Sequence, residues 1–274
     1  MSANFDILIV GGGPAGISAA LTAVNRGKTV GVIANPPETS KLYLAESITN
    51  YPGMEGSGAE IMQKMRSQLE NSSAAIIPGK ALSVISLGKT VGVAVGNDFY
   101  EACSVIIATG ISRRPLCEGE TKFLGRGGSY CATCDGMLYR GKPVVVWGLA
   151  PDAAHEANFL AGIGCAVTYF DRPKRCVIQG GQAVESITCD GQSAAVDAVF
   201  LLRPTMAPTD LFQGLAVENG YVTVDRRMAT NLPGLFAAGD CTGGPLQVAK
   251  AVGEGLIAGQ SAAAFLSAAE QKQA

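Results

Sequence analysis

Residues 5–16 read FDILIVGGGPAG, and this stretch decides the fold of the chain. Residues 5–10 are strand formers, and the alanine-rich segment 17–26 has the composition of a helix. Between them, Gly11, Gly13 and Gly16 match G-x-G-x-x-G, a spacing that allows a tight turn, close approach of a diphosphate to the backbone and close packing of helix on strand. Because the match lies between a strand and a helix, it predicts a dinucleotide-binding α/β domain rather than a purely structural glycine turn.

The same domain continues beyond this turn. A second strand is expected at residues 29–33, and it ends at Ala34 and Asn35, where a carboxylate that binds the ribose is usual. Asn35 can still hydrogen-bond a ribose hydroxyl. Further elements are expected as a helix over residues 58–72 and strands over 81–87, 91–95 and 104–107. The last strand leads into Ala108-Thr109-Gly110, a turn whose small backbone can lie against a ligand.

A second unit begins after Arg113-Arg114-Pro115. Its expected elements are a strand at residues 144–147, a helix at 152–161 and strands at 166–170, 184–189 and 195–202. The stretch 235–240 then repeats the pattern of strand followed by glycine, and residues 247–266 read as a long helix rich in alanine and glycine. We therefore predict an α/β protein of two dinucleotide-binding-like (Rossmann-type) domains, with residues 114–229 inserted between residues 1–113 and 230–274.

The insert carries the motif Cys131-Ala132-Thr133-Cys134-Asp135. Two thiols at this spacing can form a disulfide when the first lies at a helix start, where backbone N–H groups also stabilise a thiolate. The Asp135 carboxyl could pass a proton to the departing thiolate. A C-x-x-C pair is more often half of a zinc site, but His155 is the only histidine and the sequence has no second closely spaced cysteine pair. Redox chemistry is therefore favoured, and no metal site is expected.

Composition limits the remaining possibilities. Of the 274 residues, 47% are apolar, 16% are charged and 35 are glycine, which suits an α/β protein with many tight turns. The net charge of −2 gives no reason to expect nucleic acid or an anionic membrane as a partner. Apolar runs are strand-sized and residues 1–5 carry no secretory signal, so we expect a cytoplasmic protein without a membrane span. Because the cytoplasm is reducing, we expect the six cysteines outside the C-x-x-C motif to be mostly reduced, small, buried side chains.

In their order along the chain, these motifs resemble the low-molecular-weight thioredoxin reductase family of flavoproteins, and the resemblance covers nearly the whole sequence. The motifs that carry it are Gly11-x-Gly13-x-x-Gly16, Asn50-x-Pro52-Gly53, Ala108-Thr109-Gly110, Cys131-Ala132-Thr133-Cys134-Asp135 and Phe236-Ala237-Ala238-Gly239-Asp240. The resemblance implies FAD on the discontinuous domain and a homodimer. It also implies that Cys134 receives electrons from the flavin, that Cys131 attacks the target disulfide and that Asp135 supplies the proton.

The residues that the resemblance places along FAD are Gly11, Gly13, Pro14, Ala15, Gly16, Asn35, Lys41, Leu42, Asn50, Ala108, Thr109, Gly110, Gly239, Asp240 and Gln247. Within this set, the turn at residues 11–16 is implied to meet the pyrophosphate, and Asp240 with Gly239 the ribityl–pyrophosphate part. Asn50 and Thr109 have a second interpretation, as polar residues that only form turns.

The insert departs from the pyridine-nucleotide-dependent members of the family. Its counterpart of the glycine motif reads Gly148-Leu149-Ala150-Pro151-Asp152-Ala153, in which Ala150 adds a methyl group and Asp152 a negative charge where a pyrophosphate would bind. The basic cluster for a 2′-phosphate is replaced by Phe170-Asp171-Arg172, and the domain is shortened. NADPH use is therefore predicted to be lost. NADH remains an alternative, because the Asp171 carboxylate can in principle hold a ribose 2′-hydroxyl.

Residues 239–245 and 156–161 resemble the pyridine-nucleotide-independent branch, the ferredoxin-dependent flavin thioredoxin reductases. Residues 113–175 hold nine Lys/Arg and six Asp/Glu, a charge of +3, whereas the rest of the chain has 12 against 17, or −5. A basic face could attract ferredoxin, an acidic protein. We therefore predict an FAD-dependent disulfide oxidoreductase that takes electrons from ferredoxin and reduces thioredoxin or a similar disulfide protein. The alternatives are a diflavin enzyme, with a second flavin stacked on Trp147, Tyr169 or Phe170, and a flavoprotein without turnover.

Overall fold

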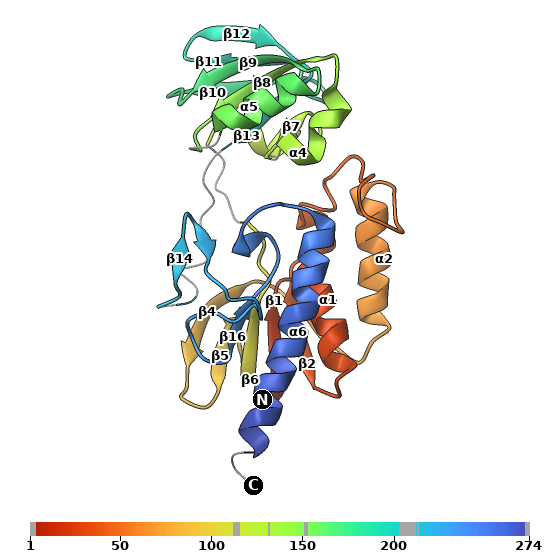
Figure 1. The fold of residues 1–274 in the computed structure, drawn as a ribbon, viewed down its shortest axis with the longest axis vertical. Coiled ribbons are helices and arrows are strands. Elements are labelled where there is room, and N and C mark those ends of the chain that lie inside the picture. Colours follow the sequence, from red (N-terminus) through yellow and green to blue (C-terminus); the bar gives the residue numbers. More distant parts are fainter. Residues whose placement is uncertain are drawn as a thin grey trace. The chain divides into compact units, whose positions relative to one another are not determined.

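The chain forms two compact units, one of which is inserted into the other (Figure 1). The computed structural model describes residues 4–111, 116–130, 132–150, 153–202, 212 and 214–271, without the side chains of Cys134 and Glu270. Unit 1 comprises Met1–Ser112 and Thr205–Ala274, and unit 2 comprises Arg113–Pro204. The predicted α/β fold of two Rossmann-like domains is confirmed.

The second boundary of the insert lies earlier than the sequence suggested. The described residues from 212 to 229 belong to unit 1, although the prediction gave residues 114–229 to the insert. The physical reason is apolar packing: Phe212, Leu215 and Val222 are buried against the sheet of unit 1. A short antiparallel pair, β14 (Val217–Glu218) and β15 (Tyr221–Val222), lies in this segment.

The core of unit 1 is a sheet whose parallel strands end together. Its parallel strands are β3 (Ala75–Pro78), β2 (Val30–Ala34), β1 (Asn4–Val10), β6 (Asp98–Ile107) and β16 (Leu235–Ala237). The antiparallel strands β5 (Val91–Val95) and β4 (Ala81–Ser86) extend the sheet from the first half of β6. The sequence did not predict β3, because this edge strand has only four residues and ends in a proline, which only an edge position tolerates.

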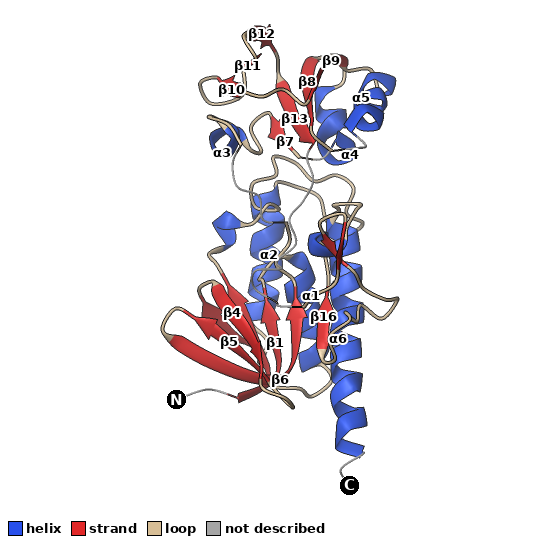
Figure 2. Cartoon of the chain, turned by 90° about the vertical axis from the view of Figure 1, so that its left-hand side faces the viewer, coloured by secondary structure: helices blue, strands red, loops and turns tan. Residues whose placement is uncertain are grey.

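Helices cover one face of this sheet, as Figure 2 shows. They are α1 (Pro14–Val24), α2 (Gly58–Glu70) and α6 (Val248–Gln271), with the short 3₁₀ helices η1 (Pro37–Thr39) and η3 (Asp240–Thr242) in the loops. α1 and α6 approach very closely, because a Cβ on Gly255 would lie 2.2 Å from the Ala15 carbonyl oxygen. Within the described residues, no helix has both the length and the apolar character that crossing a bilayer requires.

Unit 2 is built around a smaller parallel sheet. The strand order is β7 (Gly128–Ser129), β13 (Ala198–Leu202), β8 (Pro143–Gly148) and β9 (Ala166–Asp171). One core cluster joins this sheet to α4 (Ala132–Asp135), η2 (Gly136–Tyr139) and α5 (Ala153–Gly162). A second cluster joins its other face to α3 (Glu120–Phe123) and to the antiparallel strands β10 (Cys176–Gln179), β11 (Ser186–Cys189) and β12 (Gln192–Ala195).

Two cysteines of unit 2 form a disulfide, although reduced thiols were predicted outside the C-x-x-C motif. Cys176 on β10 and Cys189 on β11 are paired residues of the hairpin, and a disulfide joins them. The expectation that the cysteines outside the C-x-x-C motif are mostly reduced is wrong for these two. Their separation of 13 residues hid the pairing, since only the strand register brings the two side chains together on the buried face.

Candidate cofactor and dithiol sites

The carboxyl edge of the unit 1 sheet gathers most of the residues predicted to bind a cofactor. Val10 of β1 is in register with Ile33 of β2 and with Ile107 of β6, and Ile107 is in register with Ala237 of β16. The segments that follow these four strands therefore leave the sheet in one row. They begin at Gly11, Asn35, Ala108 and Ala238, so the glycine turn, Asn35, the Ala108–Gly110 turn and Gly239-Asp240 share one edge.

The glycine turn has the geometry that a dinucleotide needs. Gly11 has φ of 123°, and a Cβ there would lie 2.1 Å from the Ala108 carbonyl oxygen. Gly16 packs so tightly that a Cβ would lie 1.9 Å from the Gly11 carbonyl oxygen. Gly13 differs, because no atom lies within 4 Å of the position of its Cβ. The turn thus presents open backbone at the start of α1, where the helix dipole favours a phosphate, and it fits the diphosphate of FAD.

Of the other residues predicted to bind FAD, two form a hydrogen-bonded pair and three lie in the segment that follows β2. Asn50 and Gln247, 197 positions apart, are brought together by a 2.7 Å hydrogen bond from the Asn50 amide to the Gln247 carbonyl oxygen. Asn35 is exposed, whereas the Leu42 side chain is buried in the core and its carbonyl oxygen accepts from the Ala45 amide at 3.0 Å. Lys41 lies beside it in the loop after η1.

The Ala108–Gly110 turn follows β6 as predicted, and its first residue is buried. The Ala108 amide donates to the Val10 carbonyl oxygen at 2.9 Å, which fixes the turn against the end of β1. Thr109 makes only a 3.5 Å contact with the Gly110 carbonyl oxygen, and Gly110 has φ of 63° with no atom within 4 Å of its Cβ position. The geometry is that of a tight turn with an accessible backbone.

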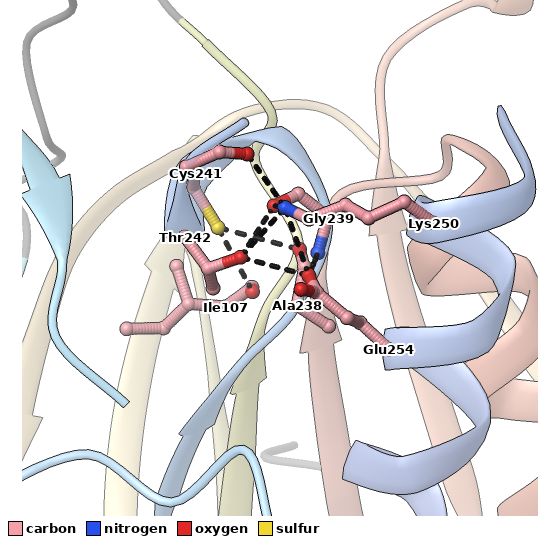
Figure 3. Close-up of polar contacts among 8 residues, drawn as sticks. Ile107, Ala238, Gly239, Cys241, Thr242, Lys250 and Glu254 are labelled. Carbon is pink, nitrogen blue, oxygen red and sulfur yellow. Dashed lines mark hydrogen bonds and ion pairs between the residues drawn. The ribbon is translucent and has the colours of Figure 1, made fainter. Parts of the chain in front are cut away.

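The loop after β16 is held by two charged residues of α6 that the sequence analysis missed (Figure 3). The Lys250 ammonium donates to the carbonyl oxygens of Gly239 and Gly243, both at 2.7 Å, and to the Thr242 hydroxyl at 2.9 Å. The Glu254 carboxylate accepts from the Gly239 amide at 2.8 Å and lies 3.1 Å from the Lys250 ammonium. No local motif predicts this network, since its partners come from a loop and a helix.

Cys241 lies on the inner side of the same loop. Its thiol donates toward the carbonyl oxygens of Ile107 and Ala238. Burial raises the pKa of this thiol to about 12, because the apolar surroundings disfavour a thiolate. Cys241 is therefore an inert core residue, as the sequence analysis expected of cysteines outside the motif.

Arg66 of α2 is a third residue that the sequence analysis did not select. One guanidinium nitrogen lies 3.7 Å from the position that a Cβ on Gly12 would take, and Ala34 at the end of β2 lines the same point. Glu70 holds the guanidinium through a 2.9 Å ion pair. Arg66 thus places a cation where the glycine turn meets the end of β2, the place at which an acidic residue was expected from the motif but is absent.

The dithiol motif lies in unit 2, and part of it lies outside the described residues. This applies to Cys131 and to the side chain of Cys134. Among the described residues, α4 covers Ala132–Asp135, which follow Cys131 directly in the sequence. The Asp135 carboxylate accepts a 2.6 Å hydrogen bond from the Ser129 hydroxyl, which fixes the carboxyl group next to the motif.

A buried carboxylate supports the residue before Cys131. The Tyr130 hydroxyl donates to Glu120 at 2.6 Å, and the other oxygen of Glu120 accepts from the Leu116 amide at 2.6 Å. Glu120 is only 1% exposed. Since a buried carboxylate is stable only with such partners, Glu120 ties the segment before the dithiol to α3. No motif in the sequence indicates this role of Glu120.

In unit 2, the described part of the turn that corresponds to the glycine motif, residues 148–150, is covered by a side chain. A Cβ on Gly148 would lie 2.5 Å from the Tyr169 hydroxyl oxygen, so the tyrosine ring covers this glycine. The amides of Leu149 and Ala150 both donate to the Leu202 carbonyl oxygen, at 2.7 and 2.8 Å. These two backbone donors of the turn are therefore engaged within the protein and do not face a pyrophosphate. Pro151 and Asp152, which the sequence analysis also invoked, lie outside the described residues.

The aromatic residues considered for a second flavin have other roles. Trp147 is 3% exposed in the core between β8 and the β10–β12 sheet, and Phe170 packs against the same core. Tyr169 is 38% exposed, and its hydroxyl lies 3.4 Å from the Asp171 carboxylate. Burial and the negative charge of Asp171 raise the pKa of the Tyr169 phenol. Two of the three rings are thus core residues.

Comparison with known proteins places these features in context. The chain matches the family model described as pyridine nucleotide-disulphide oxidoreductase over residues 5–185 and 174–255. It is 31% identical to a thioredoxin reductase of Listeria innocua, across 96% of this chain and 94% of that protein. The crystal structure of thioredoxin reductase from Streptococcus pyogenes is similar with a TM-score of 0.87 and 31% identity, covering 98% of this chain and 100% of that one. A ferredoxin-flavin thioredoxin reductase from Clostridium acetobutylicum is 38% identical with a TM-score of 0.61, covering 97% and 99%.

Proposed function

Because this chain belongs to the pyridine nucleotide-disulphide oxidoreductase family as a thioredoxin reductase-type enzyme, we propose that it binds FAD and reduces thioredoxin with electrons from ferredoxin. FAD would be held at the carboxyl edge of the unit 1 sheet, with its diphosphate on the open turn around Gly13 and its ribityl part beside Asp240. When bound, FAD supplies a group that exchanges electrons singly or in pairs, which a one-electron donor and a disulfide together require.

The proposed disulfide chemistry uses Cys131 and Cys134. The Cys131 thiolate attacks one sulfur of the target disulfide, which forms a mixed disulfide and releases the other target sulfur to take up a proton. The Cys134 thiolate then attacks Cys131 and releases the second target thiol, so the target gains two electrons and two protons. Asp135, held by Ser129, is placed next to the motif to supply a proton. Two single-electron donations from ferredoxin and two protons restore the dithiol.

The observation that carries the choice of donor is the closed turn of unit 2. Tyr169 covers Gly148, and the amides of Leu149 and Ala150 are bonded to Leu202. A pyridine nucleotide would have to displace the ring and break both backbone hydrogen bonds to the Leu202 carbonyl oxygen. Leaving that one buried acceptor unsatisfied costs about 1–3 kcal/mol. The open turn of unit 1 needs no such change. A donor that does not bind this turn is therefore favoured.

Sequence likeness and charge give weaker support for ferredoxin. The ferredoxin-flavin thioredoxin reductase of Clostridium acetobutylicum is 38% identical to this chain. Counted over unit 2 as the structure delimits it, ten Lys/Arg and nine Asp/Glu give a charge of +1, against 11 and 14, or −3, for the rest. The basic excess is thus smaller than residues 113–175 alone suggested, and it carries little of the argument.

The decisive experiment supplies reduced ferredoxin, NADPH and NADH separately to the purified enzyme and follows the reduction of oxidised thioredoxin. We expect turnover with ferredoxin and little with either nucleotide. The variants Cys131→Ser and Cys134→Ser should each abolish multiple turnover. Rapid turnover with NADPH would overturn the choice of donor, and turnover by both serine variants would overturn the dithiol mechanism.

NADH is the second candidate donor because of Asp171. This carboxylate ends β9, where a ribose 2′-hydroxyl would be recognised, and it lies close to the Tyr169 hydroxyl. Turnover with NADH but not NADPH would support this alternative. The same preparations test the diflavin alternative, since we expect one flavin per chain and that enzyme would contain two.

A homodimer is proposed as well. Leu256, Ile257 and Phe265 of α6 remain 36–44% exposed, an apolar surface on unit 1 that a second copy could cover. Sedimentation of the holoenzyme should give twice the mass of one chain, and a monomer at micromolar concentration would contradict this assignment.

A further inference from the structure

The loop from Gly239 to Gly243 has a backbone that needs support from outside. Gly239 has φ of 87° and ψ of −153°, and Gly243 has φ of 123° and ψ of −175°, both in regions that only glycine adopts readily. Within the loop, the Thr242 amide donates to the Gly239 carbonyl oxygen at 3.0 Å and the Gly243 amide to that of Asp240 at 3.3 Å. The Thr242 hydroxyl also lies 2.7 Å from the Gly239 carbonyl oxygen. At Gly239 these bonds reach only the carbonyl group, and the amide is held from outside the loop.

Side chains of α6 supply that support at both ends. Glu254 accepts from the Gly239 amide and Lys250 donates to the Gly239 carbonyl oxygen, so both backbone groups of this glycine are fixed. Lys250 also donates to the Gly243 carbonyl oxygen, which holds the loop from its other end. The Thr242 hydroxyl, 2.7 Å from Glu254 and 2.9 Å from Lys250, completes the network.

This arrangement sets the direction of one peptide group. The peptide between Gly239 and Asp240 is planar and trans, so its N–H points opposite to its C=O. Because Lys250, together with the Thr242 amide and hydroxyl, holds the Gly239 carbonyl oxygen, the Asp240 amide faces away from these donors and from α6. Asp240 is the residue that the proposed function places against the ribityl–pyrophosphate part of FAD.

We propose that Lys250 and Glu254 are positioning residues of the cofactor loop, which fix Gly239 and thereby aim the Asp240 amide at bound FAD. This inference rests on the proposed function, since it requires that FAD occupies the unit 1 site. The pair acts through the loop and does not touch the cofactor.

The burial of the pair favours this role over a contribution to stability alone. The side chains of Lys250 and Glu254 are only 15% and 18% exposed. At such burial the cost of removing both charges from water largely offsets their attraction, so an ion pair adds little net stability. Its charge-assisted hydrogen bonds do fix geometry, because each has a defined direction and length.

The test compares FAD binding by Lys250→Met, Glu254→Gln and the double variant with that by the wild type. The apoproteins are titrated with FAD, the dissociation constant is read from flavin fluorescence, and the melting temperature is measured with and without FAD. We expect Lys250→Met to weaken FAD binding about tenfold or more, because several charge-assisted hydrogen bonds to the loop are lost. Glu254→Gln retains an acceptor for the Gly239 amide and should weaken binding less.

Two further measurements separate positioning from folding. The double variant should be non-additive, since both residues act on Gly239 and Thr242. Lys64→Met, which removes an exposed lysine from α2, is the matched control and should leave FAD binding unchanged. The inference is overturned if Lys250→Met binds FAD as the wild type does, or if its melting temperature falls equally with and without FAD while the dissociation constant is unchanged. A wild-type protein that binds no FAD would instead refute the proposed function.

Discussion

At the scale of single residues, the glycines of unit 1 show how one residue type serves different purposes. Gly11 and Gly16 are required because a side chain would collide with the Ala108 and Gly11 carbonyl oxygens. Gly13 has room for a side chain, so its requirement comes from outside the protein. The sequence motif does not distinguish these roles, but the contacts do.

The substitution Gly13→Ala tests whether a cofactor occupies that room. We expect the apoprotein to keep its stability, since the Cβ meets no atom within 4 Å, and FAD affinity to fall about tenfold or more because the backbone can no longer approach the diphosphate. Fluorescence titration with FAD measures the affinity. Gly253→Ala, also without neighbours at its Cβ position, is the control and should bind FAD normally. Unchanged affinity in Gly13→Ala would place the diphosphate elsewhere.

Cys241 gives a prediction for alkaline pH. Its thiol has a pKa of about 12 in the folded protein, against 9.0 ordinarily. Above pH 9 the unfolded chain therefore releases a proton that the folded protein retains, so stability falls as the pH rises. Between pH 9 and 10.5 the free energy of unfolding should fall by about 2 kcal/mol more in the wild type than in Cys241→Ser. Urea titrations at several pH values measure this difference, and parallel pH profiles of the two proteins would contradict it.

At the scale of elements, the short helix that follows the C-x-x-C motif in the sequence exposes apolar side chains. η2 follows Asp135 directly, and its Met137 and Leu138 side chains are 60% and 37% exposed. An exposed apolar pair next to a reactive motif suits docking of a protein substrate. The sequence did not single these residues out, since an apolar residue in a helix is normally buried.

Met137→Glu should therefore impair reduction of thioredoxin more than reduction of a small disulfide. We expect kcat/KM for thioredoxin to fall about tenfold, as for one apolar anchor of an interface. Reduction of the small disulfide DTNB, which needs no docking surface, should be unchanged. Leu87→Glu, at a comparably exposed apolar position on unit 1, controls for added charge. Equal losses with both substrates would show that the residue supports the dithiol itself.

The disulfide between Cys176 and Cys189 cross-links the two strands of the β10–β11 hairpin. The joint replacement of both cysteines by alanine should lower the free energy of unfolding by about 2–4 kcal/mol, because the cross-link no longer restricts the unfolded chain. Thioredoxin reduction should persist, since the dithiol motif is untouched. Denaturation with and without a reductant provides the control: the reductant should destabilise the wild type more than the double variant, which retains only the cysteines of the C-x-x-C motif as a reducible pair. A wild type insensitive to the reductant would contradict a stabilising disulfide.

At the scale of the whole molecule, each unit has its own parallel sheet with a turn after a central strand. Only the turn of unit 1 leaves its described backbone open to a ligand. In unit 1 the turn after β1 presents Gly13 without neighbours, whereas in unit 2 the turn after β8 is covered by Tyr169 and bonded to Leu202. The two units therefore have similar folds but differ in their capacity to bind a dinucleotide, because a tyrosine ring covers the turn only in unit 2.

Ligand protection should distinguish the two units. Hydrogen exchange of the apoprotein should slow on adding FAD at the carboxyl edge of the unit 1 sheet, because a ligand that binds only the folded site stabilises it. NADP⁺ should protect neither unit 1 nor the turn at residues 148–150. If NADP⁺ at millimolar concentration protects that turn, the turn opens to bind the nucleotide. That result would favour a pyridine nucleotide as the electron donor.

The sequence by itself determined the fold class, the insertion of one unit into the other and the segments at the cofactor edge. These properties follow from local patterns: strand, glycine turn and helix each leave a signature over a few residues. The sequence also selected Asn50 and Gln247, but it could not show that the two hydrogen-bond each other.

Only the tertiary structure decided what depends on segments far apart in the chain. It decided the disulfide of Cys176 and Cys189, the support of Gly239 by Lys250 and Glu254, the cation of Arg66 at the glycine turn, and the ring of Tyr169 over Gly148. The physical reason is that each of these interactions needs two groups within a few ångströms of each other. Strand register and helix packing set that proximity, and neither is written in the spacing of residues along the chain.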